Sequence, residues 1–487
     1  MFDRAHSSVP DSDILVKMQP SSRSQKLLLP SLTGLLAIII YASTMAPDLT
    51  WAHYSSDGGE LITAVVTAGI AHPPGQPTYI VLGKMASMVP LGTIAWRFNL
   101  LSAVSAATAA AFVTATALTT LSGTRFQDIV SVATGLTFAF TALVWSQALV
   151  AEVYALNLAF ISVFLWSLLT NRSPILSGLF LGLAITTHLS SLILLPLALV
   201  LISQRNWKEL FVGFAVGLIP FLLLPILAQS ASPVVWGDPA TLSGWWRLVT
   251  GRLYYANLGL PDKDTVLARG IYLGNALLRQ FAWVGWFVVV LGLTTKLVEM
   301  RVAIALSATA LFYLIYSYLY QTDDAILYLL PIIVLISPLL AAGFSRIGSW
   351  SILVPVGLFL LNYQALNLHN DHSVRPLADK ILNSAPENAV LLTAGDQSIF
   401  TLWYFHHVEE IRDDLYLVDA NLLAFDWYRR RLSKQYADLI ALEKDDLAGF
   451  RAGNGRWRPV CEVPPALGGV VRCSFGSQGS EDHDSGG

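Results

Sequence analysis

Charged residues are scarce in this sequence, and the scarcity is confined to one part of it. Only 13% of the 487 residues are charged and 54% are hydrophobic, whereas soluble proteins carry about a quarter charged residues. Residues 27–366 hold 26 charges, while the shorter segment 367–487 holds 30. This distribution excludes a single soluble enzyme, a coiled coil, a disordered protein and a porin-type barrel. It predicts a mainly α, polytopic membrane body (27–366) followed by a polar domain (367–475).

The signatures of soluble nucleotide- and metal-dependent enzymes are also lacking. We find no Walker loop, no dinucleotide fingerprint followed by an acid, no His-Glu-x-x-His and no Cys-x-x-Cys. The net charge of −3 gives no footprint for nucleic acid. No sizeable cytoplasmic segment is expected, so an enzyme of this kind would take an activated donor from the membrane.

Apolar segments long enough for a membrane helix recur along the body. A crossing needs about 20 apolar residues. The short segments 174–187 and 189–203 could instead form one long helix, or two half-length helices that meet near His188. We expect about eleven transmembrane helices, near 27–46, 98–121, 129–149, 153–170, 174–187, 189–203, 209–228, 281–297, 302–320, 326–343 and 349–366.

Basic residues predict the orientation, because Lys and Arg mark cytoplasmic loops. Lys17, Arg23 and Lys26 precede the first span, so segment 1–26 is expected in the cytoplasm. Loop 47–97 and the domain 367–475 then lie outside, in a multi-pass protein of a bacterial-type inner or plasma membrane. The alternative, a signal peptide cleaved near Ala42-Ser43-Thr44, is disfavoured by the long polar lead.

The polar domain reads as a small α/β unit. Strands are expected at 389–394 and 415–419 and helices at 398–408 and 421–434, an order that favours a parallel sheet. Gly395-Asp396 follows the first strand, where such sheets bind ligands, although an ordinary turn is the alternative. Cys461 and Cys473 are the only cysteines, and outside the cytoplasm we expect a disulfide rather than two free thiols. Residues 476–487 are expected to be disordered.

The first outside loop carries the most informative polar residues. Asp57 and Glu60 stand three residues apart at the start of an apolar helical stretch, so they share one face and could deprotonate a hydroxyl or hold a divalent metal. The alternative is a capping box, with Asp57 as N-cap and Glu60 at N3. His72 lies in a rigid turn that ends at Pro77, where a structural role is the alternative.

Other polar residues are expected to reach the outer face. Four basic residues could hold a lipid phosphate, with snorkelling at the headgroups as the alternative: Lys84, Arg97, Arg247 and Arg252. Glu152 lies between two spans, where an ionisable group is a functional hypothesis, and His188 follows another span. Asp323 and Asp324 could bind sugar hydroxyls or merely mark a loop.

These segments resemble a known membrane family, domain of unknown function 2723, which includes the transmembrane-protein-260 type of protein O-mannosyltransferase. The resemblance covers most of the body and continues through Gly395-Asp396 and Trp427-Tyr428-Arg429. One departure is Gly58, where the family usually has a small residue such as Ser. The matching motifs are Asp57-Gly-Gly-Glu60, Ala71-His-Pro-Pro-Gly-Gln-Pro77, Arg97-Phe-Asn99, Trp145-Ser-Gln147, Ala151-Glu-Val-Tyr154-Ala-Leu-Asn157, Gly182-Leu-Ala-Ile-Thr-Thr-His188 and Tyr328-Leu-Leu-Pro331.

The resemblance implies a glycosyltransferase C fold and transfer of a sugar from a polyprenyl phosphate to an outside hydroxyl. It implies an acid of the first loop as catalyst, which here would be Asp57, and we expect Glu60 to orient Asp57 or the acceptor. The acceptor would be a protein Ser/Thr or a glycan, and no cofactor is certain beyond an optional divalent metal. A lipid-linked saccharide flippase or transporter and a non-catalytic membrane scaffold remain as alternatives. We expect the substrate to contact His72, Lys84, Arg97, Asn99, Glu152, Tyr154, His188, Arg247, Arg252, Asp323 and Asp324.

Overall fold

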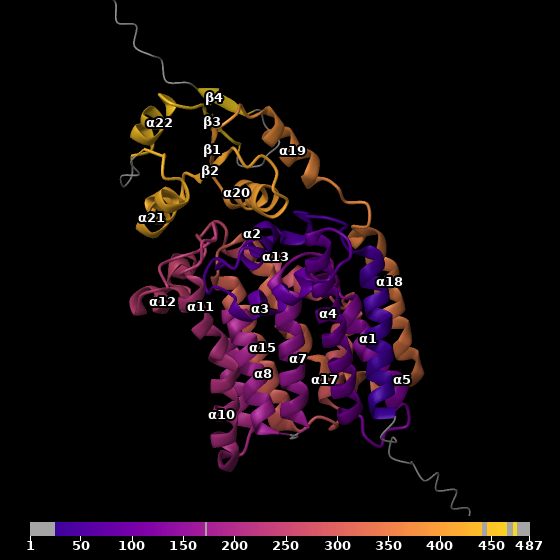
Figure 1. Cartoon of the computed structure of the whole chain (residues 1–487). Helices are drawn as coiled ribbons and strands as arrows, with labels where there is room; N and C mark the ends of the chain where they lie inside the picture. The colour runs from indigo at the N-terminus through magenta and orange to yellow at the C-terminus, as the bar shows by residue number, and fades with distance from the viewer. Residues whose placement is uncertain (1–24, 171–172, 441–445, 465–470, 475–487) are drawn as a thin grey trace, which may run out of the picture.

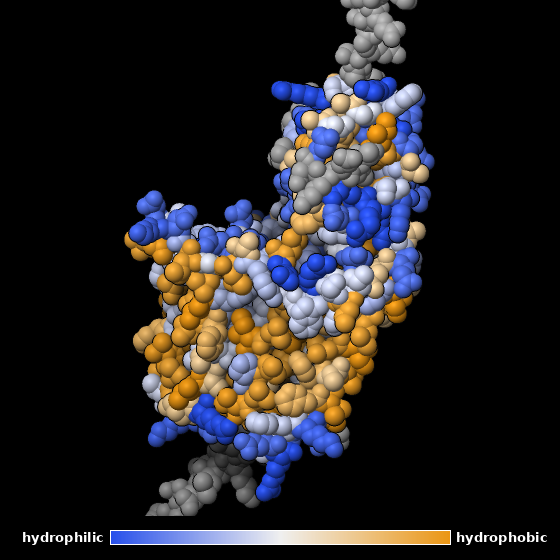
Figure 2. Space-filling view, turned by 90° about the vertical axis from the view of Figure 1, so that its left-hand side faces the viewer, coloured by the Kyte–Doolittle hydropathy of each residue, from blue (hydrophilic) through white to orange (hydrophobic). Residues whose placement is uncertain are grey.

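The structure, a computed structural model, describes residues 25–170, 173–440, 446–464 and 471–474. It has a long helical body with a smaller α/β domain on one end (Figure 1). Apolar side chains form a broad belt around the visible side of the body, and hydrophilic side chains border the belt at both ends (Figure 2). The molecule is therefore a multi-pass integral membrane protein with one domain outside the belt. Most of the predicted segment 1–26 and the tail 476–487 lie outside the described residues.

Every predicted span contains helix, but few of the helices are long. Five helical segments of the described chain are long and apolar enough to cross a membrane, or six if the bent pair Val266–Arg279 and Val284–Leu293 forms one span. The predicted count of eleven therefore stays a prediction. The body helices are α1 (Gln25–Thr44), α4 (Ile94–Thr120), α5 (Gln127–Phe140), α6 (Ala142–Gln147), α7 (Val153–Leu169), α8 (Pro174–Thr187), α9 (Leu195–Leu201), α10 (Trp207–Leu218), α11 (Leu224–Leu227), α13 (Val266–Arg279), α14 (Val284–Leu293), α15 (Met300–Leu319), α16 (Leu330–Leu335), α17 (Ser337–Ile347) and α18 (Leu353–Leu366).

Proline explains several of the breaks. Helices α9, α11 and α16 each follow a 3₁₀ segment and have proline as their second residue: Pro196, Pro225 and Pro331. A proline lacks the N–H that an unbroken helix would need at this position. The segment that was expected as one long or two short helices divides at His188, which ends α8 and precedes the 3₁₀ segment η2 (Leu189–Leu194).

Short elements gather at the end of the body that faces the α/β domain (Figure 1). Among them are η1 (Ala52–Tyr54), α2 (Gly58–Val66), α3 (Pro77–Ser87), α12 (Leu242–Val249), η5 (Arg252–Asn257) and η6 (Asp323–Leu329). Helix α2 is almost wholly buried. The first loop therefore folds into the protein instead of lying on its surface.

The C-terminal domain contains a four-stranded sheet in the order β2-β1-β3-β4. β1 runs parallel to β2 and β3, and β4 is antiparallel to β3. Cys461 and Cys473 face each other across β3 and β4 and form a disulfide. The elements are α19 (Val374–Ser384), β1 (Val390–Thr393), α20 (Asp396–Trp403), β2 (Tyr416–Asp419), α21 (Asp426–Gln435), α22 (Leu447–Gly455), β3 (Val460–Glu462) and β4 (Arg472–Ser474).

Polar contacts fix this domain to the body. The guanidinium of Arg375 donates to Asp48 Oδ2 at 2.7 Å and forms two hydrogen bonds to the carboxylate of Glu409, at 2.6 and 2.8 Å. Trp51 Nε1 donates to Thr401 Oγ1 at 3.0 Å. Since Asp48 and Trp51 belong to the first loop, the Arg375–Asp48 and Trp51–Thr401 bonds hold α19 and α20 against that loop.

Candidate active site

A cavity of about 660 Å³ lies where the body meets the C-terminal domain. Its walls come from the first loop, the α6–α7 and α8–η2 connections, η5 and η6, and from Asp396 and Phe400 of α20. Several separate chain segments thus meet around one space, and the C-terminal domain closes part of it.

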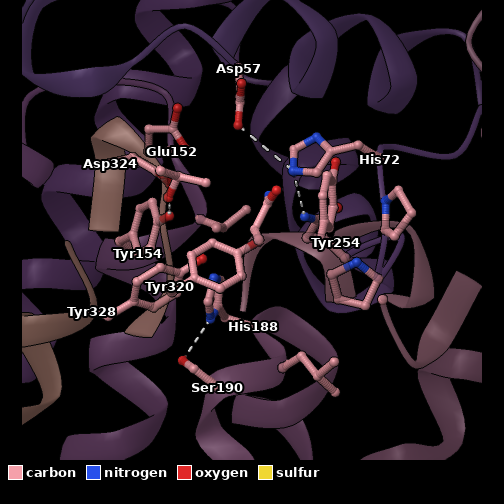
Figure 3. Close-up of a pocket in the computed structure, with 18 of the residues that line it drawn as sticks. Asp57, His72, Glu152, Tyr154, His188, Ser190, Tyr254, Tyr320, Asp324 and Tyr328 are labelled. Carbon is pink, nitrogen blue, oxygen red and sulfur yellow. Dashed lines mark hydrogen bonds and ion pairs between the residues drawn. The ribbon is translucent and has the colours of Figure 1, made fainter. Parts of the chain in front are cut away.

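Asp57 enters this cavity from the N-terminus of α2 (Figure 3). Its side chain keeps 33% of its surface exposed, and Oδ1 accepts a hydrogen bond from Ser56 Oγ at 3.2 Å. Asp57 occupies the N-cap position but makes no side-chain capping bond. The capping-box alternative is therefore wrong, and the carboxylate remains available to a ligand.

Glu60 points instead to His72. The Glu60 side chain is fully buried and accepts two hydrogen bonds, from the His72 main-chain N–H at 2.7 Å and from its ring Nδ1 at 2.5 Å. Ring Nε2 of His72 lies 3.7 Å from Asp57 Oδ2. The His-Pro-Pro-Gly turn thus places one imidazole between two carboxylates, and Glu60 acts on Asp57 through His72.

Burial and mutual charge change the pKa values within the triad of Asp57, His72 and Glu60. Burial raises the pKa of Asp57 to about 6, although the positive charge of His72 opposes the shift. Burial alone would lower the pKa of His72, but Glu60 and then Asp57 outweigh it and raise that pKa to about 10. At neutral pH, Asp57 is therefore a carboxylate of useful basicity beside a histidine cation.

An aromatic wall faces this triad across the cavity (Figure 3). Tyr154 donates from its hydroxyl to Asp324 Oδ2 at 3.0 Å. The ring of His188 lies 5.1 Å from the ring of Tyr154 and 5.4 Å from that of Tyr328, between centroids. Flat rings beside a carboxylate offer both apolar faces and a hydrogen-bond acceptor, which suits a sugar ring.

Seven predicted site residues line this one cavity. They are Asp57, His72, Glu152, Tyr154, His188, Asp323 and Asp324. They come from four different segments of the chain, and the fold brings these segments together.

The four predicted basic residues do not line the cavity, so their contact with a lipid phosphate stays a prediction. Lys84 Nζ donates to the Val66 carbonyl, and the Arg97 guanidinium binds main-chain carbonyls that include that of Ser87 at 2.7 Å. Arg247 and Arg252 are exposed. Asn99 does not line the cavity either, and its side-chain amide donates to the Ala46 carbonyl at 2.8 Å.

Several cavity residues were missed as site residues by the sequence analysis. Tyr254, Tyr320 and Tyr328 are common aromatic residues of outer segments, and no spacing links them. Trp236 lies in an irregular segment, yet its ring centroid is 6.2 Å from that of His72. For Asp396 the sequence did offer a signal of ligand binding, because Gly395-Asp396 follows a strand of a parallel sheet.

A bound divalent metal does not fit this arrangement. Both Asp57 and Glu60 face the histidine cation, and the carboxylate of Glu60 is occupied by its two bonds to His72. In the described part of the chain no three His, Cys, Asp or Glu residues are grouped to hold a metal ion. Asp57 and Glu60 are therefore better suited to proton transfer than to binding a metal ion.

Two segments match family models of known proteins. The model for the Protein O-mannosyl-transferase TMEM260 N-terminal domain matches residues 57–211, and that for TMEM260-associated domain 2 matches residues 374–444. Protein O-mannosyl-transferase TMEM260 of Mus musculus is 25% identical over 464 residues, covering 84% of this chain and 64% of the relative. The Dictyostelium discoideum protein is 23% identical, covering 80% and 57%. The chain thus spans less than two thirds of the length of these relatives.

The fold is similar to that of a solved structure. ArnT from Cupriavidus metallidurans bound to undecaprenyl phosphate matches with a TM-score of 0.58 and 12% identity, covering 91% of this chain and 93% of ArnT. The apo structure matches with a TM-score of 0.54 and 14% identity, covering 89% and 92%. The chain therefore resembles the TMEM260 proteins in sequence, and its fold is similar to that of ArnT.

Proposed function

We propose that this chain is an integral-membrane glycosyltransferase that moves a sugar from a polyprenyl-phosphate donor to a hydroxyl, with Ser or Thr of a protein as acceptor. The names of the TMEM260 relatives support mannose as the sugar and a protein as acceptor. The undecaprenyl phosphate named for the ArnT structure supports the lipid donor. The observation that carries the proposal is Asp57, a carboxylate open to a cavity and backed by the His72–Glu60 pair.

The reaction that suits this site is a single displacement. Asp57 takes the proton of the acceptor hydroxyl as its oxygen forms a bond to the anomeric carbon. The bond from that carbon to the phosphate oxygen breaks on the opposite side, and its electron pair leaves with the polyprenyl phosphate. One displacement inverts the anomeric configuration. General-base catalysis of this kind contributes about 10²–10⁴-fold.

The triad prepares Asp57 for this step. The His72 cation favours the carboxylate form of Asp57, while burial raises the pKa of Asp57 to about 6. This value is close to neutral pH, where a base is most effective. The aromatic wall and Asp324 would hold the sugar opposite the base. We further propose that the cavity opens to the extracytoplasmic side, which the Cys461–Cys473 disulfide supports.

The direct test is sugar transfer by purified protein in detergent. Labelled polyprenyl-phosphate mannose and a Ser/Thr-rich peptide are supplied, and the anomeric configuration of the product is determined. Transfer with inversion supports the proposal, whereas release of free sugar without transfer means that the donor is right and the acceptor is wrong. If folded protein acts on neither mannose nor a panel of other lipid-linked sugars, the proposal fails and the flippase and scaffold alternatives gain weight.

A further inference from the structure

One buried acid of the cavity has no part in the displacement described above. Glu152 stands at the N-terminus of α7, is 2% exposed and lines the same cavity as Asp57 (Figure 3). Its Oε1 has no hydrogen-bond partner in the described part of the chain. A buried polar atom without a partner is costly, so its persistence beside a cavity points to a ligand.

The surroundings of Glu152 oppose a negative charge. Burial and then the carboxylates of Asp57 and Asp324 raise its pKa well above the ordinary value, and the His72 cation and the Val153 N–H do not outweigh them. The titratable groups that interact with it are Asp57 at the start of α2, His72 in the first loop, Tyr79 on α3, Tyr154 on α7 and Asp324 in η6. A carboxyl in this setting keeps its proton and has an O–H to donate.

Apart from the His72 cation, which lies between two carboxylates, the cavity also lacks the basic groups that usually bind phosphate. No lysine or arginine is among the described residues that line it. Its acids are Asp57, Glu152, Asp323, Asp324 and Asp396. A donor phosphate would meet net negative charge there, and an ionised Glu152 would add to the repulsion. A protonated Glu152 does not add to that repulsion and supplies a hydrogen-bond donor to the phosphate.

We propose that Glu152 works as a neutral carboxylic acid that donates a hydrogen bond from its O–H to an oxygen of the donor's phosphate group. This inference rests on the proposed function and adds the group that recognises the phosphate. The hydrogen bond strengthens as negative charge develops on the leaving polyprenyl phosphate. Glu152 is thus a phosphate-binding residue, whereas Asp57 is the base.

Isosteric variants separate a neutral role from a charged one. Glu152→Gln keeps a hydrogen-bond donor without any charge, and Glu152→Leu removes the donor. We expect Glu152→Gln to lower kcat/KM for polyprenyl-phosphate mannose by less than about 10-fold and Glu152→Leu by about 10- to 100-fold or more, as for loss of a hydrogen bond to a charged group. Glu299→Gln, in an exposed residue just before α15, is the matched control and should leave the rate unchanged.

Infrared difference spectra read the proton without any turnover. Wild type minus Glu152→Gln should contain the C=O band of a protonated carboxylic acid at neutral pH, and undecaprenyl phosphate should shift that band to lower frequency. A carboxylate band at neutral pH overturns the inference. A Glu152→Gln variant as inactive as Glu152→Leu, or a Glu152→Leu variant with the wild-type rate, also overturns it.

Failure of the underlying function is distinguishable from failure of this inference. If wild type transfers mannose but Glu152 is ionised or dispensable, only the role of Glu152 is wrong. If wild type neither transfers sugar nor binds undecaprenyl phosphate, both proposals are overturned.

Discussion

Ring Nδ1 of His72 and the carboxylate of Glu60 lie 2.5 Å apart, and the Glu60 side chain is 0% exposed. The second ring nitrogen of the same histidine faces Asp57 at 3.7 Å. One buried acid therefore sets the orientation and charge of an imidazole, and the imidazole influences the acid that meets the cavity.

Removing the charge of Glu60 should change the pH dependence of transfer. Glu60 raises the pKa of His72, so Glu60→Gln should lower that pKa. The histidine cation that faces Asp57 is present only below the pKa of His72. Since this account has Asp57 act while paired with that cation, the loss of kcat/KM on the alkaline side should begin at lower pH in Glu60→Gln than in wild type. Glu299→Gln serves as control, and an alkaline limb in the same place for Glu60→Gln contradicts the coupling.

The acid limb should report Asp57. A base must be deprotonated, so kcat/KM in wild type should fall as the pH drops through about 6, the raised pKa of Asp57. His72→Gln removes the cation that opposes this rise, and its acid limb should lie at higher pH. A rate that stays constant well below pH 6 would exclude Asp57 as the base.

Gly59 should be intolerant of a side chain. A Cβ at Gly59 would lie 2.3 Å from the main-chain oxygen of Phe400 and 2.7 Å from its carbonyl carbon, so α20 would have to move. We expect Gly59→Ala to destabilise the protein by about 1–3 kcal/mol and to lower the transfer rate, as measured by thermal unfolding and by the transfer assay.

Gly274 provides the matched control in α13, because a Cβ there meets nothing within 4 Å. Gly274→Ala should be neutral or stabilising by up to about 1 kcal/mol. Equal effects of the two substitutions would mean that α20 is not packed on α2 as described.

Arg375 should hold the C-terminal domain in place. Its hydrogen bonds to Asp48 and Glu409 are partly buried, and Arg375→Ala should cost about 1–3 kcal/mol and increase proteolysis between body and domain. The control is Arg451→Ala, which breaks an exposed pair with Glu462 and should cost less than about 1 kcal/mol. Equal protease sensitivity of the two variants would contradict this role.

The acid pair and the turn at His72 were predictable because their signal is local. Asp57 and Glu60 start a helix, and the run of prolines fixes the turn. Their partnership was not predictable, since the Glu60–His72 contact spans 12 residues of sequence. The capping box failed for the same reason, as a tertiary contact displaced a local one.

Lys84 and Arg97 show that charge and expected position alone do not predict a binding role. Their charge and expected side of the membrane suggested phosphate binding, but each side chain donates to nearby main-chain carbonyls instead. Tyr254, Tyr320 and Tyr328 come from separate segments, and only tertiary packing brings them to the same cavity. The sequence thus predicted seven of the side chains that line the cavity, but it did not predict these tyrosines.

The central claim is that Asp57 is the base, and the most direct measurement is sugar transfer by Asp57→Asn. The matched control is Asp264→Asn, in an exposed residue outside the cavity. We predict that Asp57→Asn lowers kcat by about 10²–10⁴-fold while binding undecaprenyl phosphate and unfolding at the wild-type temperature, and that the control keeps full activity. Wild-type transfer by folded Asp57→Asn would contradict the account.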